Sequence, residues 1–213
     1  MPDKYPVEHI IEIMKSRNFK VFEGLGKSNQ YKDFDLNLVG IRNSSRVSNY
    51  FDDWYVCFYR VNKKWKIHYV AATLDPGADE LTHPSFPEAQ SRGTFILKEG
   101  EQYRSAWTLG YHGGGNWRHI ALVQTGVVSG YRDNNRNTIL DCIPQTITSG
   151  FYGINHHAAS LWSIIDTVGK YSAGCQVIQD PAEHKLMAGL WLKSAGIWGP
   201  TFSYGILNQK WFE

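Results

Sequence analysis

The sequence has little cysteine, no long apolar run and almost no net charge. Three of its 213 residues are cysteine, Cys57, Cys142 and Cys175, and this odd number indicates no disulfide framework. No window reaches the ~18 apolar residues that a membrane-spanning helix needs. The net charge is +2, so electrostatics give no case for a nucleic-acid partner. We therefore expect no membrane span and no nucleic-acid binding.

The rest of the composition is typical of a globular protein rich in β-strands. Charged residues make up 20% of the chain and hydrophobic residues 42%, which are ordinary values. Twenty glycines, eight tryptophans and twelve tyrosines favour strands and turns. We expect a mostly β fold, a sheet sandwich or half-barrel. In it, an N-terminal helix, strands and a long loop over residues 1–93 would pack on residues 94–213.

Two stretches have the pattern of helices. Near the N-terminus, apolar residues recur at helical spacing and predict a helix over about 6–17. Asp180 and Pro181 are a capping aspartate and a proline at the first helical position, which predicts a helix over about 180–194. We expect Gly196 to end that helix. Its inward face would consist of Leu186, Leu190 and Trp191.

Strands are expected along most of the remaining chain. Alternating or apolar runs predict them at 33–42, 54–61, 65–72, 94–98, 102–108, 119–124 and 126–132. The second and third would form a hairpin. Residues 73–93 hold three prolines and few periodic apolar positions, so we expect a long loop that could cover a site. Residues 161–168 would form one or two helical turns, and the tail to Glu213 one more strand or a covering arm.

The run from residue 133 to residue 141 has some of the ligands of a calcium loop. Oxygen-bearing side chains occupy positions 1, 3, 5 and 9 of such a loop: Asp133, Asn135, Asn137 and Asp141. The sixth position is Thr138 instead of glycine, and the twelfth is Pro144 instead of glutamate. Runs of this composition usually form turns. We therefore favour a turn, and expect no metal and no cofactor.

The pair most indicative of chemistry is His157 and Cys175, which lie 18 positions apart. A thiol becomes a useful nucleophile when a base takes its proton and a third group fixes that base. Gly174 has no Cβ, so the chain can turn sharply before Cys175. The N–H groups of Gly174 and Cys175 could then face the oxyanion of an acyl-transfer reaction.

Two blocks around this pair resemble the L,D-transpeptidase catalytic-domain family over roughly residues 94–180: Tyr152-Gly153-Ile154-Asn155-His156-His157 and Ser172-Ala173-Gly174-Cys175-Gln176-Val177. In that family a strand that contains a histidine is followed by a short connecting segment and then by the motif Ser-His-Gly-Cys. Its cysteine attacks the stem peptide of peptidoglycan, and an amine or water resolves the acyl-enzyme. The resemblance implies that Cys175 is the nucleophile, His157 the base and Gly174 part of the oxyanion hole. The Ser172 carbonyl would be a candidate to orient the imidazole.

One position departs from the family pattern, because its histidine before the Gly-Cys pair is Ala173 here. The change removes a polar group from the site and favours water over an amine as the acceptor. Neighbouring side chains on a strand point to opposite faces, so only one of His156 and His157 can face Cys175. The resemblance of Gly-Ile-Asn-x-His to the family's motif indicates that this residue is His157. The candidate substrate-binding residues are Asn155, His156, His112 and Ala173.

Other hydrolytic chemistries fit the sequence less well. A catalytic zinc site needs three protein ligands, and no His-x-His or His-Glu-x-x-His pattern occurs. A Ser-His-Asp hydrolase would need a nucleophile-elbow sequence that this chain lacks. A papain-like enzyme places its cysteine before its histidine, which is the reverse of the order here.

We therefore expect a cysteine acyl-transfer enzyme that acts on peptidoglycan stem peptides, either a hydrolytic L,D-carboxypeptidase or endopeptidase, or an L,D-transpeptidase. Residues 1–20 lack the apolar stretch of a signal peptide. This suits a bacteriophage protein, carried on the virion among other virion proteins or released from the host cell to the cell wall, better than an exported bacterial enzyme. The alternative is a non-catalytic virion or wall-binding module that kept the fold, which Ala173 favours.

Overall fold

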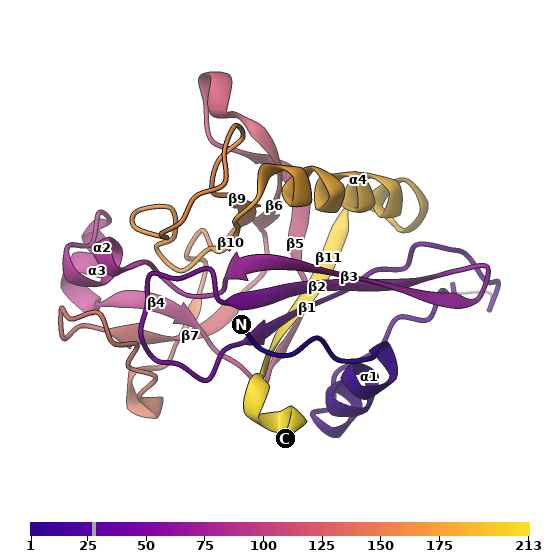
Figure 1. Ribbon diagram of the computed structural model, residues 1–213, viewed down its shortest axis with the longest axis horizontal. Helices are drawn as coiled ribbons and strands as arrows, with labels where there is room; N and C mark the ends of the chain where they lie inside the picture. Colours follow the sequence, from indigo (N-terminus) through magenta and orange to yellow (C-terminus); the bar gives the residue numbers. More distant parts are fainter. Residues whose placement is uncertain (27–28) are drawn as a thin grey trace.

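The computed structural model describes residues 1–26 and 29–213 of the chain (Figure 1). Its strands are β1 (Asn37–Arg42), β2 (Asp53–Val61), β3 (Lys64–Thr73), β4 (Thr94–Leu97), β5 (Gln102–His112), β6 (His119–Gln124), β7 (Val128–Asp133), β8 (Thr148–Gly150), β9 (His156–Ala158), β10 (Gln176–Ile178) and β11 (Thr201–Asn208). Its α-helices are α1 (Val7–Ser16), α2 (Ala78–Thr82), α3 (Pro87–Arg92) and α4 (Pro181–Trp198). Short 3-10 turns are η1 (Gly115–Trp117), η2 (Pro144–Thr146) and η3 (Gln209–Phe212).

The strands form a closed barrel with a smaller sheet beside it. Within the described residues, the barrel strands follow the order β1-β11-β5-β6-β9-β10-β3-β2, and the smaller sheet the order β4-β7-β8. Neighbouring barrel strands are antiparallel except for two parallel pairs, β1 with β11 and β9 with β10. The expected mostly β fold is confirmed. The sheet closes fully instead of stopping at a half-barrel, because β11 pairs with both β1 and β5.

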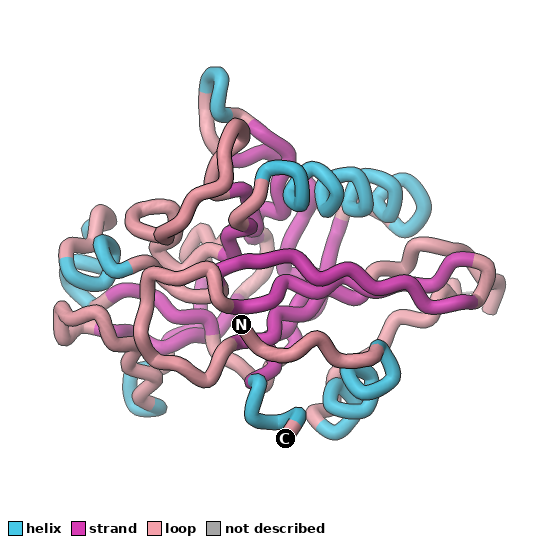
Figure 2. The backbone as a smooth tube through the Cα atoms, viewed as in Figure 1, coloured by secondary structure: helices cyan, strands magenta, loops and turns pink. Residues whose placement is uncertain are grey.

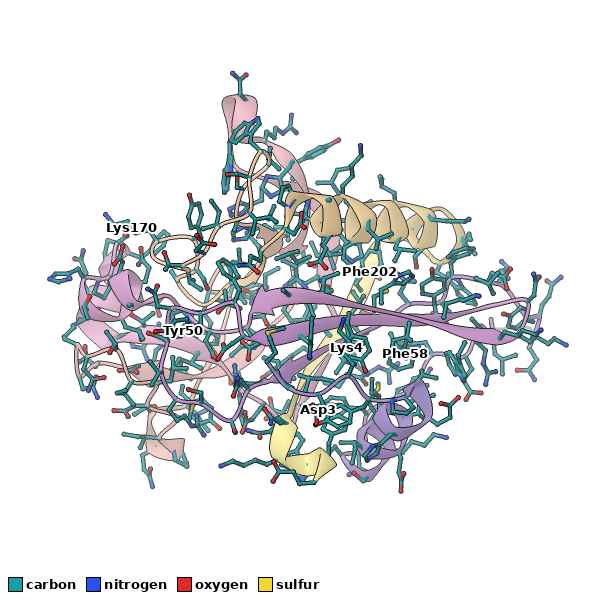
Figure 3. All side chains as sticks on the ribbon, viewed as in Figure 1. Asp3, Lys4, Tyr50, Phe58, Lys170 and Phe202 are labelled. Carbon is teal, nitrogen blue, oxygen red and sulfur yellow. The ribbon has the colours of Figure 1, made fainter. Side chains whose placement is uncertain are left out.

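Helices cover the barrel on two sides, with α4 and α1 on opposite sides of it (Figure 2). Toward the barrel interior, Tyr55 and Tyr204 pack in one cluster with Trp191 of α4. On the other face of β2, Phe58 packs with Ile10 of α1. Figure 3 shows this division, since Phe58 lies on the side of α1 and Phe202 on the side of α4. The barrel wall is therefore buried on both faces over much of its extent.

Several local predictions are confirmed. Helix α1 lies within the expected 6–17, and the side chain of Asp180 caps α4 by accepting a hydrogen bond from the N–H of Ala182. Strands β2 and β3 form the expected hairpin. Its two turn residues, Asn62 and Lys63, have φ of 50° and 63°, as a tight hairpin turn of two residues requires.

Other local predictions are wrong. Residues 73–93 are not one long loop, because they contain α2 and α3, and residues 161–168 form bends instead of helical turns. Helix α4 passes through Gly196 and ends at Trp198. Its Leu186 faces solvent, with 45% of its surface exposed. The tail, in contrast, forms the expected strand, β11, which is inserted between two barrel strands.

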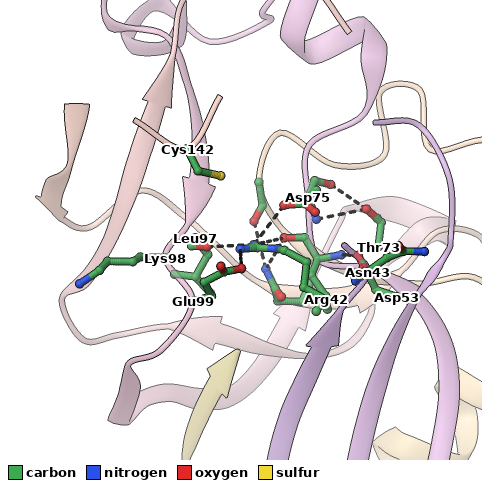
Figure 4. A network of polar contacts seen from close by, with 12 residues as sticks. Arg42, Asn43, Asp53, Thr73, Asp75, Leu97, Lys98, Glu99 and Cys142 are labelled. Atoms are coloured by element: carbon green, nitrogen blue, oxygen red, sulfur yellow. Dashed lines mark hydrogen bonds and ion pairs between the residues drawn. The ribbon is translucent and has the colours of Figure 1, made fainter. Parts of the chain in front are cut away.

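A buried ion-pair network joins the barrel to the smaller sheet (Figure 4). Arg42, at the end of β1, is 2% exposed. Its Nη2 lies 3.0 Å from Asp75 Oδ1 and donates to the carbonyl of Leu97, the last residue of β4, at 2.9 Å. Its Nη1 lies 3.2 Å from Glu99 Oε2. Since a buried charge is stable only with partners, this network fixes β4 against the barrel.

We expect Arg42→Met to destabilise the protein by about 3–5 kcal/mol, because it leaves Asp75 buried without its counter-charge. The free energy of unfolding in urea measures the effect. Arg92→Met is the matched control, since Arg92 pairs with Glu88 on the surface with 57% of its side chain exposed, and such pairs contribute about 1 kcal/mol or less. Equal losses for the two variants would contradict a structural role for the network.

Candidate functional site

The parallel pairing of β9 with β10 puts the imidazole and the thiol on the same face. Gln176 lies opposite His156, and Val177 lies opposite His157. Because side chains alternate along a strand, Cys175 and His157 both face away from the barrel interior, and Cys175 is displaced from His157 by two positions. His156 and Gln176 face inward and are fully buried.

The ring of His157 is fixed in one orientation by its neighbour in the chain. Its Nδ1 lies 2.9 Å from the carbonyl oxygen of Ala158, so Nδ1 donates and Nε2 keeps its lone pair. Burial lowers the pKa of His157 well below its usual value, and His112 acts in the same direction. The imidazole is therefore neutral at pH 7 and able to accept a proton. The expectation that the Ser172 carbonyl orients this ring is wrong, because that carbonyl accepts the N–H of Gly77.

The thiol of Cys175 is half-buried and protonated at neutral pH. Its Sγ accepts the N–H of Asn155 at 3.4 Å and lies 3.5 Å from the carbonyl of Gly153, to which it donates. Burial raises the pKa of this thiol to about 11, although the N–H of Asn155 acts in the opposite direction. In the described part of the chain, no hydrogen bond joins Sγ to the His157 ring. At rest the thiol and the imidazole are therefore both neutral.

The loop before Cys175 is held by its own side chains. Gly174 has φ of 119°, and a Cβ there would lie 2.5 Å from the carbonyl oxygen of Phe95, so glycine is required. The Ser172 hydroxyl accepts the N–H of Gly174 at 3.1 Å and donates to the Cys175 carbonyl at 2.9 Å. The N–H of Gly174 is therefore not free to bind an oxyanion. The N–H groups of Ala173 and Cys175 meet no acceptor among the described residues.

A second imidazole lies directly on the first. The rings of His112, from β5, and His157 stack with centroids 4.0 Å apart and planes at 6°. The side-chain amide of Asn155 lies 3.2 Å from His112 Nδ1, and its oxygen accepts the N–H of Gln124. Asn155 thus contacts Cys175 through its backbone and His112 through its side chain. These two expected site residues do lie beside the pair.

Two further histidines complete the cluster and were not foreseen from the sequence. His119 on β6 lies 6.2 Å from His157 between ring centroids, and both of its ring nitrogens are engaged, by Trp117 O and the N–H of Ala158. His184 on α4 lies 5.1 Å from His119. They come from elements far apart in the chain, so no local spacing could have revealed them.

The remaining predicted site residues lie elsewhere. His156 is inside the barrel, where its Nδ1 lies 2.9 Å from the hydroxyl of Tyr55 and burial lowers its pKa to about 3. The expected contact between His156 and a substrate is therefore wrong. A groove of about 900 Å³ lies away from the pair, lined by residues within 20–26 and 32–36 and by the end of α4.

The candidate calcium ligands bond to one another and to their own backbone. The Asp133 carboxylate accepts the N–H of Asp141, and the Asn135 amide donates to the carboxylate of Asp141. Asn137 accepts the N–H of Ile139. These contacts close a turn. Among the described residues, no three His, Cys, Asp or Glu side chains are grouped as metal ligands.

Neither a protein family, nor a curated protein, nor a solved structure matches this chain. None of the helices in the described ranges has the length and apolar character needed to cross a bilayer.

We expect Gly174→Ala to cost roughly 1–3 kcal/mol of stability, since alanine at this φ is strained and its Cβ collides with Phe95 O. Gly189→Ala is the control, because Gly189 lies within α4 and a Cβ there meets nothing within 4 Å. That change should stabilise by about 0.5–1 kcal/mol. Urea denaturation measures both. A Gly174→Ala protein as stable as the parent would show that the loop does not need its left-handed residue.

The buried histidines should make the protein sensitive to acid. Burial lowers the pKa of His184 to about 4, whereas an unfolded histidine titrates near 6.5. As the pH falls through that window the unfolded chain binds a proton that the folded chain does not, so about 3 kcal/mol of stability is lost at this site. His184→Phe should therefore flatten the fall of unfolding free energy between pH 6.5 and 4. His83→Gln, at an exposed histidine, should leave the slope unchanged, and equal slopes in all three proteins would refute the assignment.

Proposed function

We propose that this protein is a cysteine acyl-transfer enzyme that acts on peptidoglycan stem peptides, with water as the usual acceptor. The observation that carries the proposal is that Cys175, directly before β10, and His157, on the neighbouring parallel strand β9, lie on the outer face of the barrel wall. The fixed Nε2 lone pair of His157 supports the role of base, and the resemblance in the Ser-x-Gly-Cys block supports the substrate class.

The chemistry proceeds from the neutral pair. Cys175 turns from the Gly153 carbonyl toward His157, and its proton passes to Nε2 as sulfur attacks the peptide carbonyl. The N–H of Cys175 stabilises the oxyanion. The S–C bond forms, the peptide C–N bond breaks, and His157 gives the proton to the leaving amine. Water then attacks the thioester, His157 takes a proton from it, and the proton returns to sulfur when the S–C bond breaks.

A second candidate is a wall-binding module without turnover. The raised pKa of Cys175 and the lack of a hydrogen bond from its thiol to His157 favour it, because a ready nucleophile usually has a lowered pKa. In that case His157 and Cys175 are structural residues on the barrel surface. The two candidates differ in what Cys175→Ala changes.

The decisive experiment incubates the purified protein with muropeptides and analyses the products by mass. Loss of a residue from the stem indicates hydrolysis, and joined stems indicate transfer. We expect Cys175→Ala and His157→Gln to lower product formation by roughly 10³-fold or more, as for members of one catalytic unit. Cys142→Ala is the control and should retain activity. If the parent forms neither product and still binds peptidoglycan, the non-catalytic module is correct.

A further inference from the structure

The side chain of Gln176, which follows the nucleophile, is buried in the barrel interior. It is 0% exposed, and a buried primary amide is costly unless both of its ends are hydrogen-bonded. Its Oε1 accepts the hydroxyl of Tyr204 at 2.9 Å. Its Nε2 donates to the carbonyl of Gly174 at 3.2 Å and lies 3.5 Å from that of Leu74. An apolar side chain would fill this position without such requirements.

The contact with Gly174 sets the direction of the N–H group of Cys175. In a trans peptide the carbonyl and the N–H point in opposite directions within one plane, and the described chain has no cis peptide bond. Since Gln176 holds the Gly174 carbonyl toward the barrel interior, the N–H of Cys175 points away from it. That is the side on which the thiol lies, and the N–H has no acceptor there among the described residues.

This peptide plane needs an anchor because glycine precedes it. A residue without Cβ can exchange between conformations that reverse the following peptide group at little cost. The Ser172 hydroxyl binds the N–H of Gly174 and the carbonyl of Cys175, which belong to the two neighbouring peptide planes. Among the described residues, only Gln176 contacts the peptide plane that carries the Cys175 N–H.

The orientation of the amide is itself determined by its partners. A carbonyl oxygen can only accept, so Nε2 must face Gly174 and Oε1 must face the hydroxyl of Tyr204. The close approach of Tyr204 depends on Gly40 of β1, where a Cβ would lie 2.2 Å from the hydroxyl oxygen. A chain of contacts from β1 through β11 to β10 thus ends at the nucleophile loop.

We propose that Gln176 is a positioning residue that holds the Cys175 N–H as an oxyanion donor. The inference rests on the proposed acyl transfer and adds a residue that the resemblance does not assign. This role predicts that the loss of Gln176 changes the rates of two reactions of the Cys175 thiol by different factors. Alkylation by iodoacetamide forms an S–C bond and releases iodide without an oxyanion, whereas acylation by p-nitrophenyl acetate passes through an oxyanion before p-nitrophenolate leaves.

The test measures both rates at Cys175 in the parent, Gln176→Leu and Tyr204→Phe, with Cys175→Ala subtracted as background. Gln176→Leu should leave alkylation within about twofold and lower acylation by roughly 10²-fold, the effect of losing one oxyanion donor. Tyr204→Phe removes the hydroxyl that binds Oε1 of Gln176 but leaves its Nε2 in place. This variant should lower the acylation rate by a smaller factor than Gln176→Leu.

The possible failures are distinguishable. If Gln176→Leu lowers both rates by one factor, the residue is structural and the inference is overturned. If it lowers neither, the inference is likewise overturned, while the proposed function stands. If the parent protein is alkylated but never acylated, the proposed acyl transfer fails and takes this inference with it.

Discussion

Parallel backbone pairing of three residues of β9 with three residues of β10 determines where the imidazole of His157 and the thiol of Cys175 lie. The pairing sets Gln176 opposite His156 and Val177 opposite His157, so that Cys175 and His157 share the outer face and His156 and Gln176 the inner one. A slip of one residue would send Cys175 into the barrel and Gln176 out of it, because side chains alternate along a strand. Contacts on both faces of β10 stabilise this register. Gln176 has buried partners within the barrel, and Val177 packs in a small apolar cluster outside it.

The electrostatic character of the site follows from burial more than from charge. His157 and His119 are almost fully buried, and burial lowers the pKa of each below its usual value. Burial also raises the pKa of Cys175. Both partners of the proposed reaction are therefore neutral at rest, and proton transfer must accompany attack instead of preceding it. This differs from a site that stores a thiolate beside an imidazolium, and it would protect the sulfur from oxidation between turnovers.

Much of the local structure could be predicted from the sequence, but the contacts between distant segments could not. The alternation rule sufficed to separate His156 from His157, and the Asp180–Pro181 pair sufficed to start α4. The resemblance suggested the Ser172 carbonyl as the group that orients His157, whereas the ring binds the carbonyl of Ala158, the next residue in the chain. His119 and His184 reach the site only through the closure of the barrel. The prediction that Gly196 ends α4 was wrong, because the packing of α4 on the barrel outweighs the low intrinsic helix propensity of glycine.

The parallel pair of β1 and β11 bears on how the molecule forms. These strands are separated by most of the chain, since Leu38 lies opposite Tyr204, yet they are direct neighbours. During synthesis β1 emerges early, with one edge unpaired until β11 has left the ribosome, and unpaired edges invite association with other chains. Contacts of such sequence separation also slow folding. The loop before Cys175 is anchored through Gln176 to Tyr204 of β11, so this contact can form only after β11 has been synthesised.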